Sequence, residues 1–116
     1  MPDVYFTEDE LRHICDTMHK QIGWNAMACV GAHSLHMSQK KGPGFATLQI
    51  KTSNCATPHR VVEVTLDTGR DLYIVEGIDP VIENGKIKKD VVFTFDGAFF
   101  DTIGDLVIEA ADFKED

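Results

Sequence analysis

The sequence lacks the features that would place it directly in a familiar class. It has three cysteines and no Cys-x-x-Cys pair, and a chain of 116 residues can fold without disulfides, so reduced thiols are expected. No apolar run reaches the roughly 18 residues of a membrane span, and no basic segment precedes an apolar stretch of secretory length. These absences predict a cytoplasmic protein that does not enter a membrane.

Basic side chains are scarce in the second half of the chain. The net charge is -8, and residues 61–116 hold fourteen acidic and five basic side chains, against five acidic and six basic in residues 1–60. A field of this sign disfavours direct binding to nucleic acid and favours a basic protein surface. Solubility alone is the other interpretation of the charge.

The bulk composition predicts a single globular domain over residues 1–116. Hydrophobic residues make up 43% of the chain and charged residues 26%, which is typical of a folded protein rather than a disordered one. A chain of this length buries a modest core. There are no internal repeats and no low-complexity segments.

The clearest local signal is a helix start near the N-terminus. Thr7 and Glu10 form the pattern of a capping box, in which each side chain accepts a hydrogen bond from the backbone N–H of the other residue. A helix is therefore expected from Glu8, with apolar side chains at helical spacing as far as Ile22 and an ending at Gly23.

The middle of the chain favours strands. After Trp24 the pattern predicts two short strands or one bent strand up to Gln39, and the alternation over 45–51 predicts a half-buried strand. Residues 60–67 and 71–76 are expected to pair as an antiparallel hairpin. Residues 77–90, which contain glycines, a proline and three lysines, are interpreted as a loop, and 91–95 as a further strand.

A C-terminal amphipathic helix is expected from about Asp96 or Gly97. Its apolar stripe consists of Phe99, Ile103, Leu106, Val107, Ala110 and Phe113. The fold class that these elements predict is α+β, with an antiparallel sheet of four to six strands, an N-terminal helix and a C-terminal amphipathic helix packed on the sheet.

A row of carboxylates lies on the other side of that last helix. Side chains three or four residues apart on a helix are about 5–6 Å from one another, so like charges repel and the row lowers stability. That cost indicates a use, and we interpret the row as a partner-binding surface. Its members are Asp101, Asp105, Glu109 and Asp112, followed by Glu115 and Asp116.

Several segments together resemble a group of small proteins of bacteriophages and bacterial mobile elements. The segments are Trp24-Asn25-Ala26-Met27, Gly31-Ala32-His33, 62–67 running into 71–75, and 96–101. The resemblance covers most of residues 10–112, and the chain departs from it in the Pro58 loop and at 84–90. It implies an accessory protein of a phage or mobile element acting in the host bacterial cytoplasm, and it implies no activity, because the group has none established.

One triplet matches an enzyme motif. Asp67-Thr68-Gly69 follows an apolar strand, as in the aspartic proteases, whose paired carboxylates share a proton. A homodimer would supply two such aspartates, but the segment between Gly69 and Asp105 is too short for the flap and second long hairpin of those enzymes. An ordinary β-turn is the preferred interpretation.

The remaining chemical candidates are weak. Strand alternation places His33 and His36 on opposite faces, unlike the ligands of known zinc motifs, and apolar neighbours predict that Cys29 is a buried, inert thiol. Lys40-Lys41 and the lysines at 86–89 lie in expected loops without interleaved aromatics. We therefore expect no metal, no cofactor and no direct contact with nucleic acid.

The leading hypothesis is a non-enzymatic accessory protein that binds a host protein with a basic surface. Carboxylates at helical spacing approximate the separation of phosphates along a DNA strand, so the row would occupy a nucleic-acid-binding groove and inhibit a defence or transcription complex. The alternative is a structural or assembly module that self-associates, as a homo-oligomer, through exposed apolar strand edges. A small hydrolase using Asp67 is the minor alternative.

Overall fold

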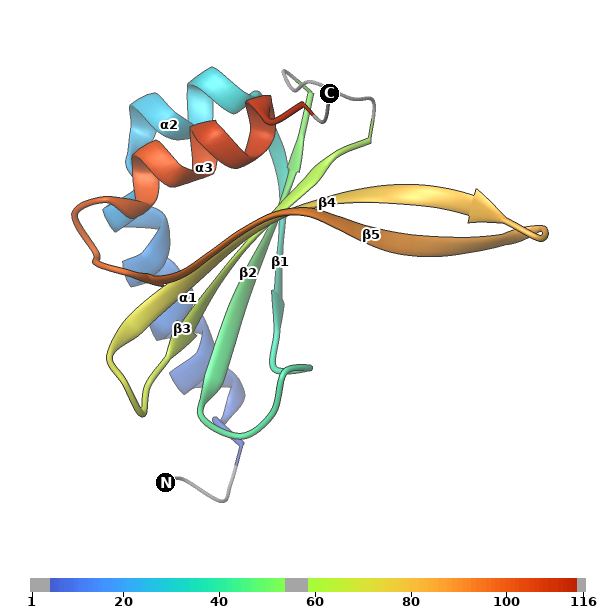
Figure 1. Ribbon diagram of the computed structural model, residues 1–116. Helices are drawn as coiled ribbons and strands as arrows, with labels where there is room; N and C mark the ends of the chain where they lie inside the picture. The colour runs from blue at the N-terminus through green and yellow to red at the C-terminus, as the bar shows by residue number, and fades with distance from the viewer. Residues whose placement is uncertain (1–4, 54–58, 115–116) are drawn as a thin grey trace.

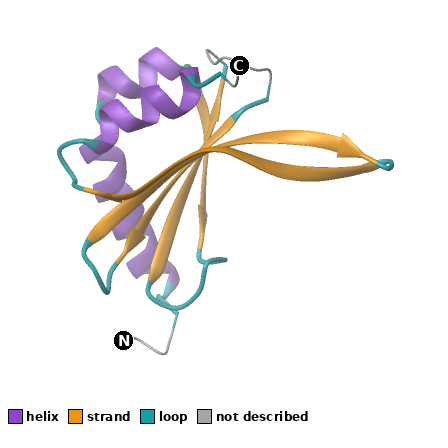
Figure 2. Cartoon of the chain, in the orientation of Figure 1, coloured by secondary structure: helices purple, strands orange, loops and turns teal. Residues whose placement is uncertain are grey.

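The computed structural model describes residues 5–53 and 59–114, which form three helices and five strands. The strands make one antiparallel sheet in the order β1-β2-β3-β4-β5. The helices lie on one face of the sheet (Figure 1), and the other face carries no helix (Figure 2). The elements are α1 (Glu8–Ile22), α2 (Trp24–Val30), β1 (Ala32–Ser38), β2 (Phe45–Thr52), β3 (Val61–Asp67), β4 (Leu72–Glu83), β5 (Lys86–Ala98) and α3 (Ile103–Asp112).

The first helix confirms the expected boundaries. The Glu10 amide donates to the Thr7 hydroxyl, the Thr7 amide donates to the Glu10 carboxylate, and Gly23 with φ 90° ends the helix. The inward stripe of α1 packs on the sheet, where Leu48 of β2 pairs in register with Val64 of β3. The buried residues of that stripe are Leu11, Cys15, Met18 and Ile22.

Residues 24–30 form a helix, so the prediction of a strand there was wrong. A short apolar run is compatible with a buried strand or a buried helix, and two glycines decide the matter here. Gly23 ends α1 and separates it from α2, and Gly31 caps α2 in the left-handed region at φ 65°. Only the second half of the expected strand region, β1, is extended.

The segment expected to be a loop between 77 and 90 consists of paired strands instead. Asn84 and Gly85 both have positive φ (53° and 76°), the condition for a two-residue hairpin turn, and Glu83 pairs with Lys86. β3 pairs with β4 only as far as Ile78. Residues 79–90 therefore extend beyond the body of the sheet as a two-stranded arm, with Ile78 and Val91 at its base, directed away from the helices (Figure 1).

The last helix is shorter than expected and begins at Ile103, because β5 continues through Ala98. A turn with a hydrogen bond from the Thr102 amide to the Phe99 carbonyl precedes it. Phe99, predicted to face the core, is 64% exposed in that turn. Ile103, Leu106, Val107 and Ala110 face the core as expected. Ala111, which the predicted stripe did not include, is buried with them, and Phe113 follows the end of the helix and is half-buried.

Two glycines allow α3 to approach its neighbours closely. A Cβ atom on Gly104 would lie 2.5 Å from the Ile22 carbonyl oxygen at the end of α1, and one on Gly77 would lie 2.9 Å from the Ala110 carbonyl oxygen. Side chains at these positions would separate the backbones. The glycines thus set the distance between α3, the α1 end and the sheet.

A buried arginine joins the arm to α3. Arg60, whose side chain is 2% exposed, donates from Nε and Nη2 to the two carboxylate oxygens of Asp79 at 2.8 Å. Its Nη1 donates to the carbonyl oxygens of Ala110, Ala111 and Phe113. These carbonyls lie at the C-terminal end of α3, where the helix has no amide partners of its own.

The predicted α+β architecture is therefore confirmed, with five strands in the sheet. Within the described residues no helix has the length and apolar character to cross a membrane.

Candidate functional site

The outward side of α3 borders a surface groove. Asp105, Glu109 and Asp112, three of the four predicted partner-binding residues, are exposed and line it. The groove has a volume of about 530 Å³, and its apolar part comes from three further side chains. We call this site the α3 groove; its lining residues are Phe93, Asp105, Ile108, Glu109, Asp112 and Phe113.

The apolar floor of the α3 groove joins two elements. Phe93 projects from β5 and Phe113 follows the last turn of α3, and their ring centroids are 5.8 Å apart at an angle of 58°. Such tilted pairs are favourable beyond the area they bury. The bond from Arg60 to the Phe113 carbonyl holds the chain at this end of the groove.

The carboxylates of the groove form no ion pair with any other described residue. None of the salt bridges between described residues includes Asp105, Glu109 or Asp112, and α3 has no basic residue in its last turn. Asp105 and Glu109 are four residues apart, and Glu109 and Asp112 three. Each like-charged pair destabilises a helix by about 0.2–0.5 kcal/mol.

Asp101 does not lie on the helix as predicted. It occupies the turn before α3, because the strand β5 ends later and the helix begins later than the sequence pattern indicates. It is exposed but does not line the groove. Glu115 and Asp116, the last two carboxylates of the predicted row, lie outside the described residues, as do Pro58 and Cys55.

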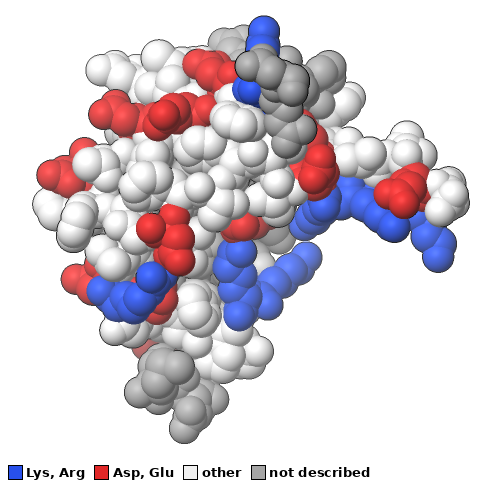
Figure 3. Space-filling model, viewed as in Figure 1, with Lys and Arg blue, Asp and Glu red and all other residues white. Residues whose placement is uncertain are grey.

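The charge distribution over the surface is uneven. Figure 3 shows acidic side chains gathered over α3, with basic atoms beside them at the top of the view, whereas further basic side chains lie along the arm, together with acidic ones, and on the surface below it. The arm contributes Lys86, Lys88 and Lys89. The lysines at 40–41 do lie in a loop, as expected, but those at 86–89 are in strand β5.

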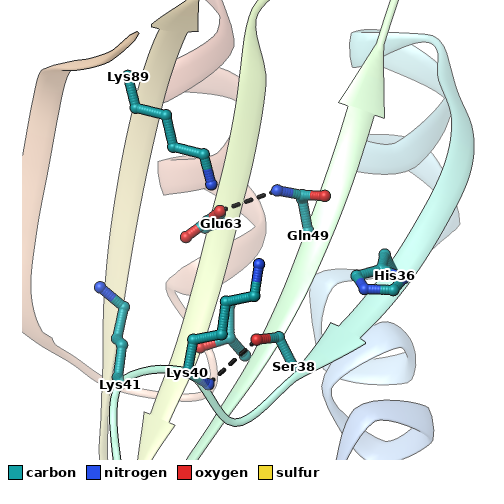
Figure 4. A pocket seen from close by; sticks show the side chains of 8 residues that line it. His36, Ser38, Lys40, Lys41, Gln49, Glu63 and Lys89 are labelled. Atoms are coloured by element: carbon teal, nitrogen blue, oxygen red, sulfur yellow. Dashed lines mark hydrogen bonds between the residues drawn. The ribbon is translucent and has the colours of Figure 1, made fainter. Parts of the chain in front are cut away.

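A second pocket, of about 480 Å³, lies on the open face of the sheet between the arm and the 39–44 loop. Lys89 and Lys40 extend toward Glu63 from opposite ends of it (Figure 4). Gln49 donates to Glu63 at 3.0 Å, and Lys41 forms a 2.6 Å ion pair with Glu76. The other lining residues are His36, Ser38, Lys41 and Thr47.

The charges in this second pocket are close to balanced. Each of its two neighbouring carboxylates, Glu63 and Glu76, accepts a hydrogen bond and lies among the lysines. An anionic ligand would meet Glu63 at the centre of the pocket, and like charges repel. The pocket is therefore a weaker candidate for a binding site than the α3 groove.

The aspartate of the protease-like triplet is held in a turn. Asp67 accepts hydrogen bonds from the Gly69 amide at 3.1 Å and from Arg70 Nε at 2.7 Å. The Arg70 guanidinium is the largest cause of a lowered Asp67 pKa. The Asp67 carboxylate is thus paired with Arg70, and the hydrogen bond from the Arg70 amide to the Asp67 carbonyl is that of the ordinary turn preferred from the sequence.

The thiols and histidines do not form a site in the part of the chain described. No group of three or more potential metal ligands occurs among those residues. Cys29 is exposed, so the prediction of a buried thiol was wrong: a helix at 24–30 turns Ala26, Met27 and Val30 inward and Cys29 outward. Cys15 is the buried thiol, and desolvation raises its pKa to about 11.

Sequence reasoning missed the floor of the groove and the arginine behind it. The sequence predicted Phe93 in a strand and Phe113 in the apolar stripe of the last helix. These residues are 20 positions apart, and local periodicity cannot predict that they contact each other. Arg60 carried no signal, because a basic residue at the start of a strand is ordinarily exposed. The one available signal for the arm was the Asn84-Gly85 pair, which favours a tight hairpin turn.

No protein-family model, curated protein or solved structure matches this chain.

Proposed function

We propose that this chain is a non-enzymatic protein-binding module whose α3 groove holds a basic, amphipathic segment of a partner protein. The single observation that carries the proposal is the combination found in the groove, an apolar floor of Phe93, Ile108 and Phe113 beside carboxylates without ion-pair partners among the described residues. A partner segment with alternating apolar and basic side chains would satisfy both parts.

The floor and the carboxylates have different roles in this proposal. Burial of apolar surface provides affinity at about 25 cal/mol per Å². Complementary charge raises the rate of association and selects the partner. A merely solubilising row of carboxylates would need no apolar floor beside it.

The resemblance to phage and mobile-element proteins extends the proposal to the kind of partner. The partner would be a host protein with a basic surface, such as a nucleic-acid-binding component of a defence or transcription complex. Glu109 and its neighbours at helical spacing are about 5–6 Å apart and would occupy the positions of phosphates. Binding would then inhibit that complex by competition.

The test is an affinity pull-down from bacterial lysate at low and at high salt. The wild-type chain is compared with an Asp105→Lys/Glu109→Lys variant and with a control in which two acidic residues far from the groove are changed, Asp9→Lys/Asp16→Lys. We expect a partner that the wild type and the control retain at low salt and the groove variant loses. A partner held equally by all three chains would contradict the proposal.

A further inference from the structure

The arm exposes apolar surface that a lone hairpin does not need. Ile82 and Ile87, directly opposite each other near its tip, are 78% and 77% exposed, and Val91 is 47% exposed. Alternation along the strands places these residues and Ile78 on the side continuous with the open face of the sheet. A two-stranded hairpin is marginally stable in water by itself, so a covered apolar side would stabilise the arm.

The outer part of the arm is also basic, in an otherwise acidic protein. Residues 80–89 contain three lysines and one glutamate, and Glu83 lies 3.5 Å from Lys88. Lys89 occupies the same side as Ile82 and Ile87, and Lys86 and Lys88 occupy the other. The apolar side of the arm thus carries one lysine, Lys89.

The α3 groove has the complementary composition. Its floor is apolar, its edge carries Asp105, Glu109 and Asp112, and none of its described lining residues is basic. Lys89 would face these carboxylates while Ile82 and Ile87 contact the floor. Both the charge and the apolar parts therefore match between two regions of the same sequence.

The two regions cannot meet within one molecule. The arm leaves the body of the sheet on the side away from the helices, and α3 lies among the helices (Figure 1). Arg60 fixes the base of the arm through Asp79 and also fixes the end of α3, which prevents the arm from folding back as a whole. A contact between the arm and the groove must therefore join two copies.

We infer that the arm of one copy docks in the α3 groove of a second copy. This inference rests on the proposed function of the α3 groove as a protein-binding site. The protein that occupies the groove is here a second copy of the same chain. Arm and groove are different surfaces, so the interface is heterologous: each added copy leaves one groove and one arm unoccupied, and copies assemble head to tail into filaments or closed rings. A partner protein would compete with the arm for the groove.

The experiment is sedimentation velocity of the full chain over a wide concentration range at low salt. The groove variant is Asp105→Lys/Glu109→Lys, and the arm variant is Lys89→Glu, which changes the lysine on the side of Ile82 and Ile87. Lys51→Glu is the control with the same change of charge as the arm variant elsewhere on the exposed surface. Circular dichroism establishes that each variant is folded, and Ile87→Thr tests the arm with its charge unchanged.

The wild type and the control are expected to sediment faster with rising concentration, whereas the groove, arm and Ile87→Thr variants remain monomeric. An equimolar mixture of groove and arm variants is expected to assemble again, because the intact arm fits the intact groove and the reversed arm fits the reversed groove. A single chain with both charge reversals is expected to assemble again. A wild type that stays monomeric, or arm variants that assemble like the wild type, would overturn the inference.

A separate measurement distinguishes failure of the arm inference from failure of the proposed function. A short amphipathic lysine–leucine peptide is titrated into wild type and groove variant. If the wild type is monomeric but binds the peptide through the groove, the arm inference fails and the proposed function stands. If neither chain binds the peptide and the wild type is monomeric, both fail.

Discussion

Arg60 and Asp79 form a two-point ion pair behind the sheet, with both donor–acceptor distances at 2.8 Å and the arginine side chain 2% exposed. Asp79 lies at the base of the arm. The remaining guanidinium nitrogen of Arg60 donates hydrogen bonds to the carbonyls at the end of α3. One side chain therefore fixes the positions of both surfaces on which the proposals depend.

Loss of this arginine is expected to be strongly destabilising. Arg60→Ala leaves Asp79 without its two-point donor and removes the donors to the α3 carbonyls, and breaking a buried ion pair costs about 3–5 kcal/mol. Urea denaturation gives the free energy of unfolding. Arg60→Lys is the informative control, because it keeps the charge but lacks the planar fork, and we expect it to recover only part of the loss. A loss below about 1 kcal/mol for Arg60→Ala, the value of an exposed pair, would contradict the role assigned to this residue.

Helix propensity and packing predict opposite effects of Gly104→Ala on the free energy of unfolding. Alanine is favoured over glycine inside a helix by about 1 kcal/mol, yet a Cβ atom here would lie 2.5 Å from the Ile22 carbonyl oxygen. We expect Gly104→Ala to lower the free energy of unfolding by about 1–3 kcal/mol, as overpacking does. Glu109→Ala, on the exposed side of the same helix, is the control and should change stability little. A stabilised Gly104→Ala chain would show that α3 can move away from α1 at little cost.

Asp112 lies at the unfavourable end of the helix dipole. A negative charge in the last turn opposes the dipole, and α3 has no basic residue there. Asp112→Lys is therefore expected to stabilise the chain by about 0.5–1 kcal/mol while weakening binding at the groove. Thermal unfolding and a titration with the lysine–leucine peptide measure the two effects. Asp105→Lys, in the first turn, is the matched control that should weaken binding without the gain in stability. If Asp112→Lys gains stability and keeps full affinity, Asp112 has no part in the groove.

The two described cysteines should differ in reactivity. Burial raises the pKa of Cys15 from 9.0 to about 11, which at pH 8 lowers its thiolate fraction about 100-fold. Cys29 is exposed. In a Cys55→Ser background, a disulfide reagent should modify Cys29 in the folded chain and Cys15 only after unfolding. Cys29→Ser is the control that removes the fast reaction. A fast reaction that persists in Cys29→Ser would contradict the burial of Cys15.

The same thiol predicts a change of stability with pH. The folded state favours the neutral thiol, so the stability contributed by its raised pKa is present below pH 9 and is lost as pH rises toward 11. Burial also raises the pKa of Tyr73, so the ionisation of Tyr73 at high pH lowers the free energy of unfolding as well. Denaturation of wild type and Cys15→Ala across this range isolates the cysteine, and parallel curves for the two chains would argue against a cost of ionising Cys15.

The contributions of the apolar floor and of the carboxylates to binding at the groove can be distinguished by their dependence on salt. Ile108→Ser should weaken binding of the basic peptide at all salt concentrations, because it removes apolar surface and leaves the charges unchanged. Asp105→Asn/Glu109→Gln should weaken it mainly at low salt, since exposed charges are screened within about 10 Å at 0.1 M. Isothermal titration at two salt concentrations measures both. Equal salt dependence in the wild type and the amide variant would indicate that the carboxylates are only a solubilising surface.

The parts of this fold that follow from the sequence are those with a local signature. The capping box of Thr7 and Glu10 fixed the start of α1, and the alternation in β2 and β3 predicted strands whose residues 46, 48 and 50 are buried. The C-terminal stripe from Ile103 to Ala110 likewise predicted a helix that packs on the sheet. In each case one period is sustained long enough to outweigh the alternatives.

The errors have equally specific causes. The run 26–30 was too short for periodicity to separate helix from strand, and Gly23 and Gly31 decided in favour of α2. The polar residues at 77–90 obscured the turn signal of Asn84-Gly85, because a hairpin that projects into solvent need not alternate in polarity. The groove itself depends on contacts between Phe93 and Phe113, and such long-range contacts leave no trace in local spacing.

The bonds of Arg60 also bear on how the native state opens. Because one guanidinium holds Asp79 and the carbonyls from Ala110 to Phe113, the base of the arm cannot detach without releasing the final turn of α3. These two segments, far apart in the chain, should behave as one cooperative unit of local unfolding, and their amides should share a single free energy of hydrogen exchange.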